Sequence, residues 1–223
     1  MNGMLSMGRN GRPLRIAVPK GSLFPDSVRL LQEVGLDVGA LPDPGRLLTI
    51  SAGGVEYIIG KPTDIPIYVA YGAVDVAIAG KDTLVEADME VVEMVDLGFG
   101  ACRFVVAEPE EAAATVLEHY RDLGVIRVAT KYPRITERYF AEQGVQAEIV
   151  KLHGNIEIAP LIGIADRVVD ITATGTTLRD NHLRIVDDVL ESTARFVANP
   201  VSLKTRAAEV TELANRLAEV SVQ

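Results

Sequence analysis

The sequence predicts an α/β protein, because short apolar strands alternate with helical segments along most of the chain. Glycine or proline marks most boundaries between the two kinds of segment. With 223 residues, of which 48% are hydrophobic, the chain is long enough to bury one or two cores. We therefore expect largely parallel sheets with helices on both faces.

The first half repeats a strand, turn and helix pattern that one hairpin interrupts. A strand at 14–18 runs into a Pro-Lys-Gly turn and a helix that ends at Gly35. Two apolar runs, 47–51 and 55–59, flank an Ala-Gly-Gly turn and predict a hairpin. The further elements expected here are a helix capped by Asp64 and ended by Gly72, a strand at 74–79, a short helix after Gly80, and strands at 91–95 and 101–107.

The second half continues the alternation. Its expected elements are helices at 109–120, 133–143 and 156–164, strands at 126–129, 147–152, 168–171 and 194–198, and an amphipathic helix from Pro200. Two β-rich passages, 98–107 and 193–199, are candidate crossings between two lobes. They assign 1–102 plus 196–223 to lobe I and 103–195 to lobe II. Because ligands of α/β proteins commonly bind between domains, an interlobe cleft is the expected site.

The charge balance and the cysteine count exclude several classes of function. The chain has 22 Lys and Arg residues and 31 Asp and Glu residues, so its formal net charge is −9. This negative charge disfavours nucleic acid and anionic membranes as partners. A single cysteine, Cys102, excludes an intrachain disulfide, and three scattered histidines give no metal-ligand spacing. No run of residues is typical of a membrane span or a secretory signal, so we expect a cytoplasmic protein.

The segment 168–178 is the most informative part of the sequence. A strand ends in Asp170 and enters a turn rich in threonine, in which Gly175 lets backbone amides approach a phosphate closely. Asp170 is placed to accept hydrogen bonds from ribose hydroxyls. A plain turn that closes a buried strand is the alternative interpretation. The candidate ligands of a ribose phosphate are Asp170, Thr172, Ala173, Thr174, Gly175, Thr176 and Thr177.

Two further strand-to-helix turns carry lysine. Lys20 follows the first strand, and Lys81 follows the strand at 74–79. Each lysine has a glycine beside it and a helix N-terminus after it, which together favour an anion site. Asp82 is a candidate Mg²⁺ contact and is equally a simple helix cap. The residues that complete these candidate sites are Gly21, Ser22 and Gly80.

A longer string with fixed spacing points to a family. Residues 157–178 read E-x5-G-x-A-x2-V-x-D-I-x2-T-G-x-T-L, beginning at Glu157. This string resembles the signature of ATP phosphoribosyltransferase, which opens histidine biosynthesis. The resemblance extends to the segments 16–23, 64–66 and 72–82. Short motifs often occur without the function that they indicate, but so many fixed positions seldom arise by chance.

The resemblance implies a fold, a reaction and roles for individual residues. The fold would be two α/β lobes of the type II periplasmic-binding-protein kind, with the active site in the interlobe cleft. The reaction would transfer phosphoribose from phosphoribosyl pyrophosphate to N1 of the adenine of ATP, with Mg²⁺ accompanying the pyrophosphate that is released. Residues 174–177 would hold the 5-phosphate, and Asp170 and Glu157 would hold the ribose hydroxyls. Arg46 and Lys61 would bind the triphosphate and the pyrophosphate, although many relatives have arginine where this chain has Lys61.

The resemblance also implies partners. The sequence after Pro200 has no room for the regulatory domain of long-form relatives, so the chain resembles the short form. Short-form enzymes work with a regulatory subunit similar to histidyl-tRNA synthetase, as a catalytic dimer within a hetero-octamer. Two alternatives stay open: a type I phosphoribosyltransferase, which usually has two adjacent acids where this chain has Val169 and Asp170, and a non-catalytic pair of ligand-sensing lobes.

Overall fold

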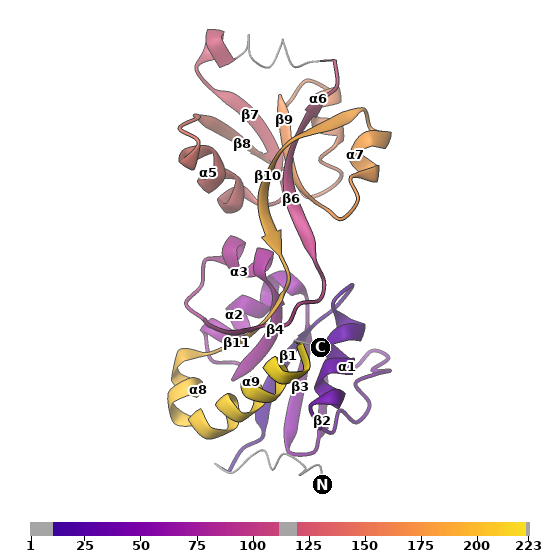
Figure 1. Cartoon of the computed structure of the whole chain (residues 1–223), viewed down its shortest axis with the longest axis vertical. Coiled ribbons are helices and arrows are strands. Elements are labelled where there is room, and N and C mark those ends of the chain that lie inside the picture. Colours follow the sequence, from indigo (N-terminus) through magenta and orange to yellow (C-terminus); the bar gives the residue numbers. More distant parts are fainter. Residues whose placement is uncertain (1–10, 112–119, 222–223) are drawn as a thin grey trace. The chain divides into compact units, whose positions relative to one another are not determined.

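The computed structural model describes residues 11–111 and 120–221 (Figure 1). The chain divides into two compact units. Unit 1 comprises Met1–Gly100 and Thr193–Gln223, and unit 2 comprises Ala101–Ser192. None of the described helices is both long and apolar enough to cross a membrane.

Unit 1 is built on a six-stranded mixed sheet. Its strands are β1 (Leu14–Pro19), β2 (Thr49–Ala52), β3 (Val55–Gly60), β4 (Val76–Gly80), β5 (Val92–Asp96) and β11 (Ala194–Ala198). They lie in the order β2-β3-β1-β4-β11-β5. β1 pairs in parallel with β3 and β4, whereas β2 runs antiparallel to β3, and β11 runs antiparallel to both β4 and β5.

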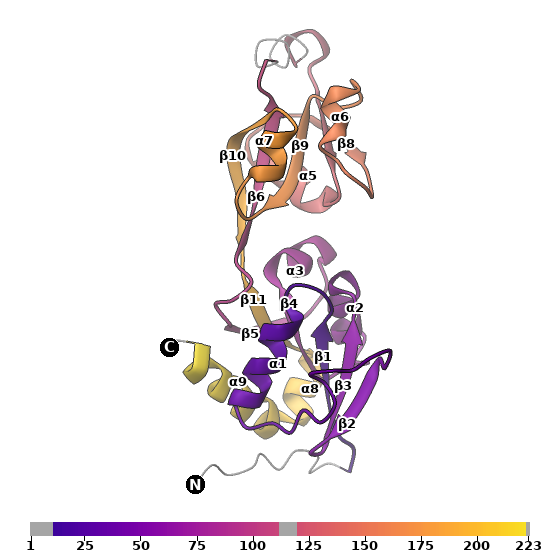
Figure 2. The same ribbon diagram turned by 90° about the vertical axis from the view of Figure 1, so that its right-hand side faces the viewer.

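Helices cover both faces of the unit 1 sheet (Figure 2). Its helices are α1 (Phe24–Glu33), a 3-10 turn at Pro62–Asp64, α2 (Ile65–Ala70), α3 (Lys81–Ala87), α8 (Pro200–Thr205) and α9 (Ala207–Ser221). Leu31 of α1 and Leu213 of α9 pack with Ile16 in the core on one face. Ile65 of α2 and Leu84 of α3 pack in the core on the other face. Full burial of each such leucine or isoleucine is worth about 1.5–3 kcal/mol.

Unit 2 is built on a five-stranded mixed sheet. Its strands are β6 (Cys102–Pro109), β7 (Ile126–Thr130), β8 (Ala147–Lys151), β9 (Arg167–Thr172) and β10 (Leu183–Ser192). They lie in the order β10-β6-β9-β7-β8. β7 pairs in parallel with β8 and β9, and β6 runs antiparallel to both β9 and β10.

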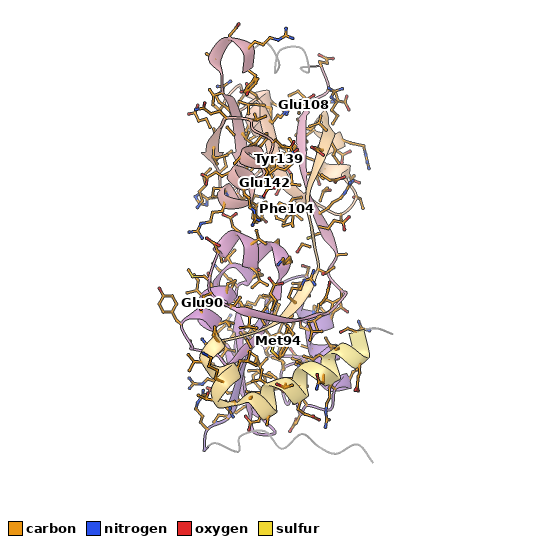
Figure 3. All side chains as sticks on the ribbon, turned by 60° about the vertical axis from the view of Figure 1, so that its left-hand side comes forward. Glu90, Met94, Phe104, Glu108, Tyr139 and Glu142 are labelled. Atoms are coloured by element: carbon orange, nitrogen blue, oxygen red, sulfur yellow. The ribbon has the colours of Figure 1, made fainter. Side chains whose placement is uncertain are left out.

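The helices of unit 2 also lie on two sides of its sheet, as Figure 1 shows. Its helices are α5 (Pro133–Glu142), α6 (Ile158–Leu161) and α7 (Thr176–Asp180). Ala159 of α6 and Leu178 of α7 pack with Val168 of β9 in one core. Phe104 of β6 meets the ring of Tyr132, which precedes α5, edge to face with the centroids 4.7 Å apart. Figure 3 shows Phe104 and Glu108 near opposite ends of β6.

The prediction of largely parallel sheets was wrong, because both sheets are mixed. Parallel neighbours need a long crossover connection. The β2–β3 hairpin turns within two residues, Gly53 and Gly54, and its strands are antiparallel. The strands at the two passages between the units, β5, β6, β10 and β11, also pair antiparallel within their own sheets, which a count of alternating elements does not reveal.

Several predicted helix boundaries also need correction. Asp64 does not cap α2 with its side chain, because its Oδ1 accepts from the Thr63 hydroxyl over 3.3 Å and the 3-10 turn leads directly into the helix. Asp82 lies in the first turn of α3, and Gly80 is the residue at its N-cap. The helix predicted at 109–120 overlaps the end of β6 at Pro109, and most of its remainder lies outside the described residues.

Three features were predicted with the wrong extent or not at all. The helix predicted at 156–164 is reduced to the four residues of α6. The helix from Pro200 is broken at Arg206, between α8 and α9. The strand β10 was not predicted, because exposed charges at Asp187, Asp188 and Glu191 disturb its apolar alternation, and its pairing with β6 shifts register twice.

Candidate active site

Asp170 lies in unit 2 near the end of β9, where it is only 9% exposed. Its Oδ1 accepts a hydrogen bond of 2.8 Å from the amide of Ile171. Its Oδ2 lies 3.7 Å from Nζ of Lys131. The carboxyl is therefore nearly buried and held from two sides.

Burial raises the pKa of Asp170 above its usual value, and the nearby Glu157 carboxylate raises it further. The Ile171 amide and the Lys131 ammonium act in the opposite direction without cancelling the rise. Glu157 is half-buried at the start of α6, whose Ala159 shares a core with β9. The structure thus brings together the two acids that the sequence predicted for the ribose.

The turn after β9 is held open by its own threonines. The hydroxyl of Thr172 accepts from the amide of Gly175 over 2.7 Å, and the hydroxyls of Thr174 and Thr176 lie 3.0 Å apart. Gly175 has a φ of +73°, which glycine adopts readily and other residues do not. Within the described ranges, no backbone carbonyl accepts from the amides of residues 174–177. The Thr176 amide donates to the Thr174 hydroxyl over 3.4 Å, and the amides of Thr174 and Thr177 have no acceptor among the described residues, which leaves donors for an anion in the cradle formed by this turn.

Arg179 of α7 adds a positive charge to this cradle. Its Nη1 donates to the Thr174 carbonyl and its Nη2 to the Thr176 hydroxyl, each over 3.2 Å. The exposed hydroxyl of Thr177 and the exposed Ala173 complete the turn. Arg179 was not predicted from the sequence, because a basic residue in an exposed helical turn is ordinarily a solvated surface charge.

Lys20 and Lys61 of unit 1 follow adjacent strands at one edge of the sheet. β1 and β3 are parallel with Pro19 opposite Gly60, and the Lys20 amide donates to the Gly60 carbonyl over 2.8 Å. The two lysines therefore leave the sheet side by side. Both side chains are exposed, and neither makes a hydrogen bond or ion pair with another described residue.

Arg46 belongs to the loop that enters β2 at the same edge. The Ile59 amide donates to the Leu48 carbonyl over 2.8 Å, which places the start of β2 beside the end of β3. Arg46 is exposed two residues before Leu48, and it too is unpaired within the described part of the chain. Three unpaired cations therefore come from one edge of the unit 1 sheet.

The turn at Gly80 extends this edge, because β4 is the parallel neighbour of β1 on its other side. A Cβ at Gly80 would lie 2.1 Å from Oδ1 of Asp82, so any side chain here would displace that carboxylate. Unlike Lys20, Lys81 forms an ion pair, because its Nζ lies 2.5 Å from Oε1 of Glu93. Gly21, with a φ of +90°, and Ser22 follow Lys20 as an exposed turn.

Two further reactive side chains, those of His153 and Cys102, belong to unit 2. His153 is exposed before α6, and Cys102 is half-buried in β6. Among residues 11–111 and 120–221, no group of three or more His, Cys, Asp or Glu side chains is arranged to hold a metal ion.

Comparison with known proteins shows the family to which this chain belongs. The model of the HisG family, ATP phosphoribosyltransferase, matches residues 61–219. The chain belongs to the ATP phosphoribosyltransferase family. An ATP phosphoribosyltransferase from Rubrobacter xylanophilus is 52% identical over 89% of this chain and 92% of the relative. One from Moorella thermoacetica is 47% identical over 94% of each chain.

Solved structures agree with this family and with the predicted fold class. The ATP phosphoribosyl transferase (HisG:HisZ) complex from Thermotoga maritima matches with a TM-score of 0.80 and 30% identity over 93% of this chain and 98% of that chain. A periplasmic aliphatic sulphonate binding protein from Escherichia coli matches with a TM-score of 0.58 at 14% identity, over 94% of this chain and 72% of that chain. The predicted type II periplasmic-binding-protein fold is confirmed at the level of fold.

Proposed function

We propose that this chain transfers the phosphoribosyl group of phosphoribosyl pyrophosphate to N1 of the adenine of ATP, the first step of histidine biosynthesis. The observation that carries the proposal is the cradle after β9, where no described backbone carbonyl accepts from the amides of residues 174–177 and where Asp170 and Glu157 interact electrostatically. Such a site suits a phosphorylated ribose, and the chain belongs to a family named for this reaction.

In this proposal, unit 2 holds the sugar phosphate. The amides and hydroxyls of residues 174–177 bind the 5-phosphate, and Thr172 and Ala173 shape the start of the turn. Asp170 and Glu157 accept hydrogen bonds from the ribose hydroxyls. These carboxylate oxygens would then orient the ribose ring before the bond at C1 breaks.

Unit 1 supplies positive charge in this proposal. The cations that bind the pyrophosphate and the triphosphate are Lys20, Arg46 and Lys61. The neighbouring turns add Gly21, Ser22, Gly80 and Lys81 to this phosphate site. As C1 of the ribose gains oxocarbenium-like charge, the departing pyrophosphate gains negative charge, which fixed cations stabilise. Because the side chains of Lys20 and Lys61 have no partner among the described residues, their charges are available for this task.

We propose that Mg²⁺ enters with the phosphate oxygens of the substrates, since the described residues form no metal cluster of their own. Mg²⁺ bound in this way neutralises charge on the pyrophosphate. Asp82 is the candidate protein contact, because its carboxylate lies in the first turn of α3 beside the cationic edge.

The proposed assembly is a catalytic dimer that joins a regulatory subunit similar to histidyl-tRNA synthetase in a cytoplasmic hetero-octamer. Support comes from the Thermotoga maritima structure, which is a HisG:HisZ complex. Co-expression with such a subunit, followed by measurement of mass in solution, tests the assembly. A catalytic chain that elutes alone, with unchanged mass, would contradict it.

A spectrophotometric assay of phosphoribosyl-ATP tests the reaction itself. Purified protein with Mg²⁺, ATP and phosphoribosyl pyrophosphate should form the product, and Asp170→Asn should lower kcat/KM about 10- to 100-fold, as expected for loss of hydrogen bonds to a charged group. The exposed Asp180 offers a matched control, Asp180→Asn, which should retain activity. Binding of both substrates without turnover, even with the regulatory subunit present, would favour the sensor alternative.

A further inference from the structure

Lys131 lies beside Asp170 because of the strand register in unit 2. β7 and β9 are parallel with Thr130 opposite Val169, so Lys131, the first residue after β7, lies next to Asp170, which is still within β9. Lys131 Nζ and Asp170 Oδ2 are 3.7 Å apart. Lys131 is the one residue with a salt bridge to Asp170 in the part of the chain that the structure describes.

The surroundings of Asp170 oppose its charge. Burial is the largest influence, and the Glu157 carboxylate adds repulsion from the segment before α6. β6, on the other side of β9, places the apolar Val105 opposite Asp170. The Ile171 amide and the Lys131 ammonium are the two groups that favour the carboxylate form.

The proposed ribose role requires that charge. A carboxylate accepts hydrogen bonds at both oxygens, whereas a protonated carboxyl presents one donor to hydroxyls that must themselves donate. Hydrogen bonds to an ionised acceptor are also roughly twice as strong as neutral ones. A cation that keeps Asp170 ionised therefore acts on sugar binding without touching the sugar.

A purely structural role explains Lys131 less well. The side chain is 37% exposed and its distance to Asp170 is long for a hydrogen-bonded pair. Because the lysine end of this pair is open to solvent, its attraction to Asp170 is screened and contributes little to folding. The pair is therefore too weak to matter chiefly for stability.

We propose that Lys131 is a positioning residue of phosphoribosyl transfer, which keeps the Asp170 carboxylate ionised and aimed at the ribose hydroxyls. This inference rests on the function proposed above. Lys131 itself was not among the residues selected from the sequence, because its proximity to Asp170 depends on the register between two strands that are distant in the chain.

The chain offers a matched control in Lys151. β7 lies between β9 and β8, and Thr130 of β7 lies opposite Lys151 of β8. Lys151 ends its strand at the same edge of the sheet, is exposed and makes no ion pair with any other described residue. It therefore shares the sheet edge and the charge of Lys131 but not the contact with Asp170.

The test compares the pH profiles of kcat/KM for phosphoribosyl pyrophosphate in the wild type, K131M, K131R and K151M. The acid limb of K131M should move to higher pH, with activity about three- to fivefold below wild type on the acid side and nearly equal on the alkaline side. K131R should restore the wild-type limb, and K151M should follow the wild type throughout. A K131M profile that superimposes on the wild type, or that is lowered equally at every pH, would overturn the inference.

An NMR titration of the Asp170 carboxyl carbon gives a readout that does not depend on turnover. Its pKa should be higher in K131M than in the wild type and unchanged in K151M. If the wild type lacks transferase activity, the proposed function fails while the titration still decides whether Lys131 holds Asp170 ionised. If the wild type is active and the Asp170 pKa is unmoved in K131M, the role of Lys131 alone fails. K131Q provides the same comparison should K131M fold poorly.

Discussion

The hydroxyl of Thr172 accepts a hydrogen bond of 2.7 Å from the amide of Gly175. This contact joins the last residue of β9 to the residue before α7, and it closes a turn in which Gly175 has a φ of +73°. Among the described residues, no backbone carbonyl accepts from the amides of Thr176 and Thr177, which follow this turn. The shape of the proposed phosphate cradle therefore depends on one threonine that precedes it.

Replacing Thr172 by valine should loosen the cradle. Valine keeps the branched shape and loses the acceptor, so the Gly175 amide would lose a hydrogen bond worth about 0.5–1.5 kcal/mol. We expect a rise in the KM for phosphoribosyl pyrophosphate that exceeds any change in the KM for ATP. Steady-state kinetics measure both, with Thr172→Ser as the control that retains the hydroxyl. Equal effects on the two substrates would argue against a local role.

Replacing Gly175 by alanine should distort the same turn. The new Cβ would lie 3.3 Å from Cδ1 of Ile185, and the left-handed backbone costs an L-residue about 1–2 kcal/mol. Gly144 offers a control with similar φ, +67°, and nothing within 4 Å of its Cβ position. Both variants should be destabilised, but Gly175→Ala alone should weaken binding of phosphoribosyl pyrophosphate in calorimetry. Equal affinities for the two variants would contradict this prediction.

Arg206 and Asp75 form a buried ion pair in unit 1, with Nη1 and Oδ2 3.2 Å apart and both side chains at most 3% exposed. Nη1 of Arg206 also donates to the Pro13 carbonyl over 3.0 Å. Arg206→Met would leave the Asp75 carboxylate without one of its partners, which for buried pairs typically lowers the free energy of unfolding by about 3–5 kcal/mol. Urea denaturation measures this loss.

The control for Arg206→Met is a surface pair. Arg138 lies 3.0 Å from Glu142 on α5 and is 74% exposed. Arg138→Met should change the free energy of unfolding by less than about 1 kcal/mol. Similar losses for the two variants would show that burial of the Arg206 pair contributes little.

The pH dependence of stability should also depend on Asp75. Burial raises its pKa, but hydrogen bonds from Arg12, the Arg15 amide and Ser202 outweigh burial and leave the pKa below its usual value. The stabilisation is therefore complete above the pKa of the unfolded chain and is lost as the pH falls through the lower pKa of the folded chain.

We expect Asp75→Asn to be less stable than the wild type at neutral pH and to lose less stability on acidification. Urea denaturation over a series of acidic pH values measures both effects. The exposed Asp43 gives a control, Asp43→Asn, which should keep the wild-type slope. A wild-type slope in Asp75→Asn would show that another group governs acid stability.

Local patterns were enough to predict many elements of the fold. The Gly53-Gly54 turn predicted the β2–β3 hairpin, and the apolar spacing after Pro133 predicted α5. The other elements depend on contacts between residues that are distant in the sequence. Arg206 breaks the last helix where its guanidinium meets Asp75, 131 residues earlier in the chain, and no local signal announces that contact.

The same distinction applies to the candidate site. The Thr-Gly turn after Asp170 is a continuous motif, so its residues could be selected from the sequence. Lys131 could not, because its relation to Asp170 follows from the pairing of β7 with β9. The alignment of Lys20 with Lys61 likewise follows from the parallel register of β1 and β3.

An NMR titration of ¹⁵N-labelled protein with phosphoribosyl pyrophosphate tests the cradle most directly. We predict saturable shifts of the amides of Gly175, Thr176 and Thr177 that are larger than those elsewhere in unit 2. Ribose 5-phosphate should produce the same pattern, since it carries the same phosphate. Saturable binding that leaves these three amides unshifted would contradict the assignment of this turn to the sugar phosphate.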